Sequence, residues 1–189
     1  MAVRPITPIG HPVLRTPTRD VTPEELASVE IQTLIDDLID TMREANGAGI
    51  AANQVFEDVR IATIEVTENP RYPYKPPIPL TVIVNPSWTA VDDETVTINE
   101  GCLSVPLRGD LQRSVTIEVS YLDRHGTPQR EIRRGLTAGT FQHEIDHLDG
   151  RLIVDRIDPR TLATWEQFET HQRDAFVERI SQFVDRVGS

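Results

Sequence analysis

The sequence predicts an α+β fold in which mostly antiparallel sheets surround a central helix and a further helix closes the C-terminus. Three observations support this prediction: an early helical pattern, a middle section of short β-branched stretches, and two late helical patterns. Strands grouped together between helices are typical of α+β proteins. A chain of 189 residues is long enough for one core, so we expect residues 1–189 to form a single domain.

The first helix is expected to begin at Thr22 and to continue as one long amphipathic helix. Thr22 suits the N-cap, Pro23 the first turn, and Glu25 the third position of a capping box. Apolar residues then recur at helical spacing, namely Leu34, Ile35, Leu38 and Met42. Asn46-Gly47 ends the pattern.

Four β-branched stretches in the middle of the chain predict strands of a largely antiparallel sheet. They are residues 61–66, 80–84, 96–98 and 115–121. Between the first two stretches, residues 69–77 hold several prolines, which cannot donate to a sheet ladder. We therefore expect an exposed loop there.

Two helices are expected after the strands. Residues 136–148 return to helical spacing and end at Gly150. A last helix is expected to start at Asp158-Pro159 and to carry an apolar stripe: Trp165, Phe168, Phe176, Ile180, Phe183 and Val187. We interpret this stripe as core packing rather than as an interaction surface.

Composition limits the function. The formal net charge of −11 argues against a broad nucleic-acid surface, so no direct nucleic-acid binding is expected. No apolar run is long enough to cross a bilayer and no secretory signal is recognisable, which predicts a cytoplasmic location without a membrane partner. The single cysteine, Cys102, is either a small buried apolar residue or a metal-binding thiolate.

The strongest chemical signal is the sequence His-Glu-Ile-Asp-His at residues 143–147. On a helix, His143 and His147 lie on one face and can bind one metal ion, while Glu144 lies beside the water that such an ion activates. The alternative is a chance grouping on a solvated helix. Apolar neighbours weaken that alternative because they indicate a half-buried helix: Phe141, Ile145 and Leu148.

Two further segments complete the pattern. Two histidines leave a catalytic metal site one protein ligand short, and Cys102 offers a thiolate just after the strand predicted to end at Ile98. An inert buried cysteine is the alternative. Residues 47–54, Gly-Ala-Gly-Ile-Ala-Ala-Asn-Gln, allow close approach of a ligand, and Gln54 can donate from its amide. A tight turn would explain this segment equally well.

These three segments, in this order and spacing, resemble the signature motifs of the peptide deformylase family. The family patterns are a glycine-alanine segment ending in glutamine, Glu-Gly-Cys-Leu-Ser, and Gln-His-Glu-x-Asp-His-Leu-x-Gly. Residues 142–150 match the last pattern at every fixed position, and residues 10–15 resemble the family's opening. Asn53 departs from the family, in which proline or threonine is common at this position.

The resemblance implies a metal-dependent amide hydrolase that removes the formyl group from the N-terminal formylmethionine of nascent polypeptides and releases formate. It implies three metal ligands: Cys102, His143 and His147. It also implies that Glu144 is the general acid and base, and that the Gln54 amide and the Leu103 backbone N–H face the formyl oxygen.

The same resemblance implies how a peptide is held. Gly49 and Gly101 would offer backbone groups to an extended peptide. The methionine pocket would be lined by five residues: Ala48, Ile98, Leu136, Gly139 and Thr140. Because Ala48 and Gly139 are small, we expect a wider or shallower pocket and no strict methionine selectivity. The alternative is that Gly139 simply permits tight packing against the sheet.

The surroundings of the metal ligands and the ion itself are predicted by analogy. Arg113 is expected near Glu100 and Asp146, where it would orient the ligands, with a plain surface ion pair as the alternative. One thiolate and two imidazoles suit Fe²⁺, Zn²⁺, Ni²⁺ or Co²⁺. The resemblance favours Fe²⁺. The expected partners of the protein are N-formylated nascent peptides, and a transient contact with the ribosome is expected as well.

Two other enzymes share part of the pattern. One is a deformylase-like paralogue that acts on a small N-formyl metabolite. The other is a zinc endopeptidase, which shares the two-histidine helix but usually takes a glutamate or histidine downstream as its third ligand. A metal-storage protein would leave Glu144 and Gln54 without a role. The remaining histidines have no ligand spacing and are expected at the surface: His11, His125 and His171.

Overall fold

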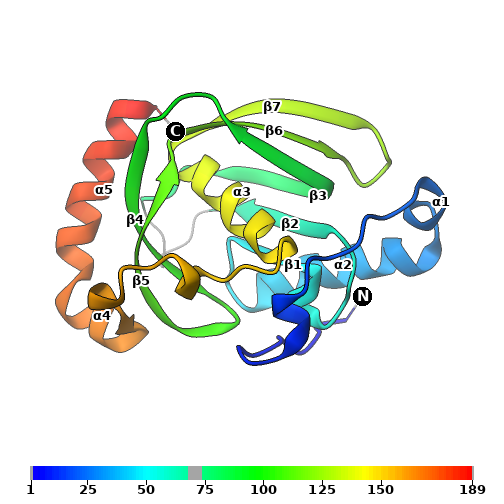
Figure 1. The fold of residues 1–189 in the computed structure, drawn as a ribbon, viewed down its shortest axis with the longest axis horizontal. Helices are drawn as coiled ribbons and strands as arrows, with labels where there is room; N and C mark the ends of the chain where they lie inside the picture. The colour runs from blue at the N-terminus through cyan, green and yellow to red at the C-terminus, as the bar shows by residue number, and fades with distance from the viewer. Residues whose placement is uncertain (1, 68–73, 189) are drawn as a thin grey trace.

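The computed structural model describes residues 2–67 and 74–188 of the protein. Two antiparallel sheets lie on either side of one helix, α3 (Gly135–Leu148), which passes through the middle of the molecule (Figure 1). This arrangement confirms the predicted α+β class. Within the described residues, the structure contains no helix that is both long and apolar enough to span a membrane.

The larger sheet has five strands in the order β1-β2-β3-β6-β7, and each neighbouring pair is antiparallel. Its strands are β1 (Gly49–Ala51), β2 (Ile61–Val66), β3 (Ile78–Ala90), β6 (Thr116–Leu122) and β7 (Pro128–Arg134). Side chains of one face, such as Ile64 and Ile117, pack against Phe141 and Ile145 of α3 in a single apolar cluster. That packing fixes which face of α3 turns away from the sheet.

The smaller sheet consists of β4 (Thr95–Cys102), β5 (Val105–Ser114) and β8 (Ala163–Thr164), again antiparallel. β4 is longer than predicted and ends at Cys102, where the register with β5 shifts between Gly101 and Cys102. Cys102 therefore lies just before the turn of the hairpin, with its Sγ 3.1 Å from Nε2 of His147 on α3.

The other helices cover the outside of the sheets. They are α1 (Pro23–Leu26), α2 (Val29–Glu44), α4 (Trp165–His171) and α5 (Arg173–Val187), with short 3₁₀ turns η1 (Pro12–Arg15), η2 (Ala52–Val55), η3 (Ile153–Asp155) and η4 (Pro159–Thr161). In Figure 1, α5 lies along the outer side of β4 and β5. Phe176 and Ile180 of α5 join Ile98 of β4 and Leu136 of α3 in one apolar cluster.

The prediction of one long N-terminal helix was wrong. The expected capping box is present, with Glu25 N–H donating to Thr22 Oγ1 at 3.2 Å, but the helix ends after one turn. Ser28 then caps a second helix by accepting from Ile31 N–H at 3.3 Å. A serine in an extended conformation satisfies the donors of a new first turn, and this stabilises the break.

The prediction of one terminal helix starting at Asp158-Pro159 was also wrong. Asp158 caps only the short turn η4. Strand β8 follows because Thr164 pairs with Leu107 of β5, and the chain then forms α4 and α5 as separate helices. The predicted apolar stripe does form core contacts, with Phe168, Phe176, Ile180 and Phe183 buried.

Strands β5 and β7 were not predicted from the sequence.

The exposed loop predicted at residues 69–77 is only partly as expected. Residues 69–73 lie outside the described residues. Tyr74–Pro77 form no strand, as predicted, but Tyr74 and Lys75 are half-buried rather than exposed.

Candidate metal centre

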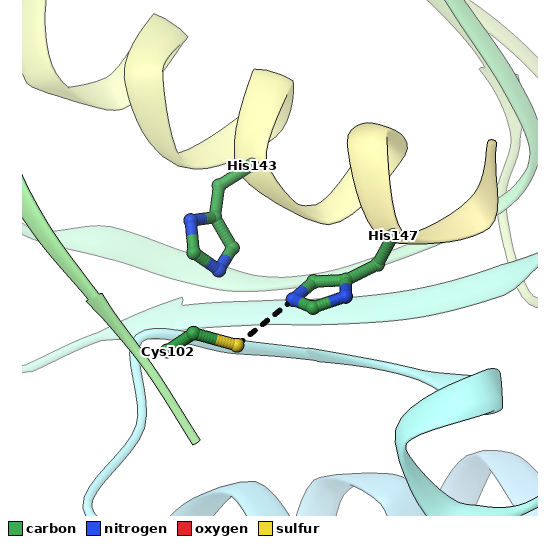
Figure 2. Close-up of side chains that lie close together, drawn as sticks. All are labelled: Cys102, His143 and His147. Carbon is green, nitrogen blue, oxygen red and sulfur yellow. Dashed lines mark hydrogen bonds between the residues drawn. The ribbon is translucent and has the colours of Figure 1, made fainter. Parts of the chain in front are cut away.

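Three potential metal ligands converge between α3 and the tip of the β4–β5 hairpin. His143 and His147 lie one helical turn apart with ring centroids 5.0 Å from each other. Cys102 Sγ is 3.1 Å from His147 Nε2. Figure 2 shows both rings extending from α3 toward the cysteine, and one ligand atom from each residue lies within 4.8 Å of the others.

Donor type and spacing both fit a divalent metal ion. A thiolate and two imidazoles are ligands that zinc and iron accept, at about 2.0 to 2.3 Å from the ion. Small side-chain rotations would bring all three donors to such distances around one point. Three protein ligands leave one coordination position for substrate or water, which is the arrangement of a catalytic site.

The surroundings of the two histidines shift their pKa values in opposite directions. Burial lowers the pKa of His147 well below its usual value, and the nearby His143 lowers it further, so His147 is neutral and available as a ligand. Burial also lowers the pKa of His143, but hydrogen bonds with Cys102 and Glu100 outweigh this and raise it to about 10. His143 must therefore release a proton when it binds a metal.

A buried cation holds the ligand region together. Arg113 is 1% exposed and donates from Nε and Nη2 to the two oxygens of Glu100, both at 2.8 Å. Its Nη1 donates to Asp146 Oδ2 at 2.5 Å. Glu100 Oε2 is 2.9 Å from His143 Nδ1, so Glu100 fixes the ring with Nε2 facing the other ligands. Arg113 therefore lies where it was predicted, and it links Glu100 of β4 to Asp146 of α3.

These contacts determine the protonation states of Glu100 and Arg113. Burial raises the pKa of Glu100, but the charge and hydrogen bonds of Arg113 outweigh it and hold this pKa well below the usual range. Burial similarly lowers the pKa of Arg113, and the two carboxylates raise it above its ordinary value. Glu100 is therefore a carboxylate at neutral pH and can orient His143 as a hydrogen-bond acceptor.

Glu144 lies next to the ligands in an environment suited to proton transfer. The side chain is buried, and Oε2 has no hydrogen-bond partner among the described residues. Burial raises its pKa to about 7, against the opposing charges of His143 and Lys75. A carboxyl group with such a pKa can accept and return a proton near neutral pH. Gly49 makes room for it, because a Cβ there would overlap the Glu144 carboxylate.

Gln54 directs its side-chain amide toward Cys102. Its Oε1 accepts from Ala51 N–H at 3.0 Å, which turns the Nε2 group toward Cys102 Sγ at 3.5 Å and Ser104 Oγ at 3.1 Å. Leu103 follows the cysteine at the hairpin tip and borders the same cleft. Gln54 therefore presents an amide donor beside the metal ligands.

One cleft runs along these groups. Its lining includes most of the residues predicted for catalysis or substrate binding: Ala48, Gly49, Gln54, Ile98, Glu100, Gly101, Cys102, Leu103, Leu136, Gly139, Thr140, His143 and Glu144. Arg113, Asp146 and His147 are buried and are not among the residues that line the cleft. The other three histidines are exposed, as expected: His11, His125 and His171.

Gly139 allows close contact between α3 and β4. A Cβ at this position would lie 3.0 Å from Ile98 Cδ1, so the isoleucine already occupies the adjacent space. This contact agrees with the packing explanation for the glycine. Gly139 also lines the cleft, and the wider pocket stays a prediction.

Several cleft residues were not predicted from the sequence. They are Gly47, Tyr74, Lys75, Asn99 and Arg108. Asn53 was given no role, yet it is buried and its Nδ2 donates to the His147 carbonyl at 2.5 Å, tying η2 to the end of α3. Gly47 and Asn53 belong to segment 47–54, which was singled out from the sequence, but neither was given a role. Tyr74, Lys75, Asn99 and Arg108 lie outside the three motifs and reach the cleft only through the folding of the chain.

The family assignment comes from comparison with known proteins. A model of the polypeptide deformylase family matches residues 3–163. The chain belongs to the peptide deformylase family. Accordingly, it is a metal-dependent hydrolase, and the resemblance of the three motifs is confirmed.

Individual relatives agree over most of the chain. Peptide deformylase 2 of a Nostoc species is 44% identical over 82% of this chain and 86% of its own. A Xylella fastidiosa peptide deformylase is 41% identical over 84% of this chain and 89% of its own. A class I type b peptide deformylase from Acinetobacter baumannii, solved with Met-Ala-Ser bound, is 38% identical with a TM-score of 0.80 and covers 82% of this chain and 99% of its own.

Replacing Arg113 by methionine should destabilise the protein and weaken metal binding. Removing one partner of a buried ion pair leaves uncompensated charge, which typically costs about 3 to 5 kcal/mol in the free energy of unfolding. Loss of the group that holds Glu100 against His143 should also weaken metal affinity, roughly 10- to 100-fold. Denaturant unfolding and a competitive chelator titration measure the two effects.

Arg130→Met is the matched control for this variant. Arg130 of β7 pairs with Glu118 of β6, and the Arg130 side chain is 72% exposed. The control should stay within about 0.5 kcal/mol of the parent protein. Equal stability and equal metal affinity for Arg113→Met and Arg130→Met would contradict the role given to Arg113.

Proposed function

We propose that this protein removes the formyl group from the N-terminal formylmethionine of nascent polypeptides and releases formate and a free amino terminus. The observation that supports this most is the single cleft bordered by Cys102, His143, Glu144 and Gln54. A metal-ligand set, a buried carboxyl group and an amide donor around one cleft suit hydrolysis of a small amide.

Cys102, His143 and His147 would hold the metal ion. When bound, the ion acts as a Lewis acid toward the formyl carbonyl and toward water. Glu100 keeps the ring of His143 in the orientation that binding requires. The soft thiolate and the two imidazoles are compatible with Fe²⁺, which we propose as the physiological ion, and with Zn²⁺, Ni²⁺ or Co²⁺.

Glu144 would move the proton. As a carboxylate it accepts a proton from the attacking water, and as the acid it returns that proton to the amine nitrogen that leaves. Its buried position keeps both forms accessible near neutral pH because burial has raised its pKa to about 7. Its unpartnered Oε2 is the atom assigned to this transfer.

Two donors would stabilise the charge that develops on the formyl oxygen. Gln54 Nε2 lies beside Cys102, and Leu103 follows it in the chain, so a formyl oxygen near the ligands would meet the amide and the Leu103 N–H together. Gly49 and Gly101 would offer backbone groups to an extended peptide. The first side chain of that peptide would lie among Ala48, Ile98, Leu136, Gly139 and Thr140.

The partners follow from the same proposal. The Acinetobacter baumannii relative bound to Met-Ala-Ser supports a peptide as the occupant of the cleft. N-formylated chains emerge from ribosomes, so we propose a cytoplasmic site of action and a transient ribosome contact. With a net charge of −11, such a contact would depend on a local patch rather than on the whole surface.

A comparison of substrates separates the proposed function from the small-metabolite alternative. The metal-loaded enzyme, purified without oxygen, should release formate from formyl-Met-Ala with a kcat/KM at least about tenfold above that for free N-formylmethionine, because only the dipeptide offers a backbone to Gly49 and Gly101. Metal analysis of the same sample identifies the ion. A preference for the free N-formyl amino acid would favour the alternative.

Glu144→Gln should abolish most formate release without loss of metal. Glutamine keeps the size of the side chain but cannot accept the proton, and such general acid–base groups typically contribute about 10²- to 10⁴-fold to turnover. A formate assay with formyl-Met-Ala measures turnover, and elemental analysis measures metal content. Near-parental turnover in a fully metal-loaded Glu144→Gln protein would rule out the proposed role of Glu144.

A further inference from the structure

Lys75 is the only lysine of this sequence, which contains nineteen lysine and arginine residues in total. It lies in the lining of the cleft rather than on the surface. The established features of the site do not require a cation at this place. Its position in the cleft therefore calls for a separate explanation.

The Lys75 ammonium group lies one helical turn from the metal ligands. Its Nζ donates to Thr140 Oγ1 at 3.2 Å, and that hydroxyl in turn donates to the Leu136 carbonyl at 3.1 Å. Thr140 precedes His143 and Glu144 by three and four residues, so all three lie on the same face of α3. One turn of helix is about 5.4 Å, which is close to the reach of a methionine side chain.

The walls between the ligands and Lys75 are mostly apolar. Ile98 and Leu136 are buried, and Ile98 fills the space beside Gly139. The segment that carries Lys75 is anchored by the preceding residue, because Tyr74 packs edge-on against Phe176 of α5 with ring centroids 5.2 Å apart. The pocket for the first side chain is thus apolar along its length and polar at its end.

We propose that Lys75 makes this enzyme accept a first residue of methionine length that ends in a neutral hydrogen-bond acceptor, such as methionine sulfoxide. The proposal rests on the proposed function, since it concerns the side chain next to the formyl group. A sulfoxide oxygen at the end of the pocket accepts from the Lys75 amine, a thioether does so only weakly, and a norleucine side chain cannot. The apolar walls meanwhile contact the methylene groups that all three share.

A carboxylate at the same place should be accepted less well. The carboxyl groups of Glu100 and Glu144 line the same cleft as the Lys75 side chain. A further negative charge near them would also lose its hydration on entering the cleft. A neutral acceptor fits the end of this pocket better than a formylated glutamate does.

Formylated dipeptides that differ in the first side chain test the proposal. The quantity is the kcat/KM for formyl-methionine-sulfoxide-Ala divided by that for formyl-norleucine-Ala, measured on the zinc-loaded full chain. Lys75→Met should lower this ratio about tenfold, as expected for loss of one hydrogen bond from a charged donor. Arg130→Met, which removes an exposed cation from β7, should leave the ratio unchanged.

Binding can be measured without turnover, because the chain has one lysine. Growth with ¹³Cε-lysine gives a single labelled side chain, so its NMR signal needs no assignment. In the zinc-loaded protein, the product peptide carrying methionine sulfoxide before Ala-Ser should shift this signal more than the norleucine peptide does. The two peptides differ only at the end of the first side chain.

The outcomes separate the two proposals. If the zinc-loaded enzyme releases no formate from any of these dipeptides, the proposed function fails, and the NMR comparison still decides the role of Lys75. An unchanged substrate ratio in Lys75→Met would overturn that role. Equal NMR shifts with the two product peptides would overturn it as well, and a preference for formyl-Glu-Ala over the sulfoxide would show that the pocket selects charge instead.

Discussion

Burial of α3 between two sheets requires partners for the polar side chains that it carries. A buried polar group without a hydrogen bond destabilises a fold, so a helix with glutamine, glutamate, aspartate and two histidines can occupy this position only if neighbouring strands supply those partners. Gln142 bonds the backbone of Ser114 at both ends of its amide, at 3.1 Å and 2.9 Å. Asp146 meets Arg113, and His143 meets Glu100.

Three atoms on this helix are exceptions. Glu144 Oε2, Asp146 Oδ1 and His147 Nδ1 are buried and have no hydrogen-bond partner within residues 2–67 and 74–188. The first belongs to the residue assigned to proton transfer, the second to the carboxylate that pairs with Arg113, and the third to a proposed metal ligand. A buried acceptor without a structural partner, such as Glu144 Oε2, is typical of functional sites, where the missing interaction is made during catalysis or with a ligand.

The central residues of the candidate site could be predicted from local patterns because they lie in short sequence segments with recognisable spacing. The spacing of His143 and His147 places both on one face of a helix. Runs of β-branched residues predicted those strands that are rich in apolar residues. Strand β7 was missed because its sequence, Pro-Gln-Arg-Glu-Ile-Arg-Arg, is almost entirely polar; it is held by the backbone ladder to β6. Lys75 and Asn53 were missed as site residues because only the folded chain brings them to α3.

Aromatic residues of the C-terminal helices α4 and α5 pack against residues that line the cleft. Arg108 lies over the rings of both Trp165 and Phe168, at 4.4 Å and 3.6 Å, while Tyr74 contacts Phe176. Trp165, Phe168 and Phe176 lie beyond residue 163, where the match to the family model ends. The proposed metal ligands thus come from the part of the chain that matches the family model, and residues that line the cleft are supported by a segment outside that match.

We propose that the sulfur of Cys102 and one ring nitrogen each of His143 and His147 bind a single ion and leave one position open. X-ray absorption spectroscopy of the metal-loaded protein tests it most directly. The structure predicts one sulfur at about 2.3 Å, two imidazole nitrogens at about 2.0 to 2.1 Å, and a fourth, light-atom ligand from solvent. A spectrum without sulfur, or with four protein ligands around the ion, would contradict the account.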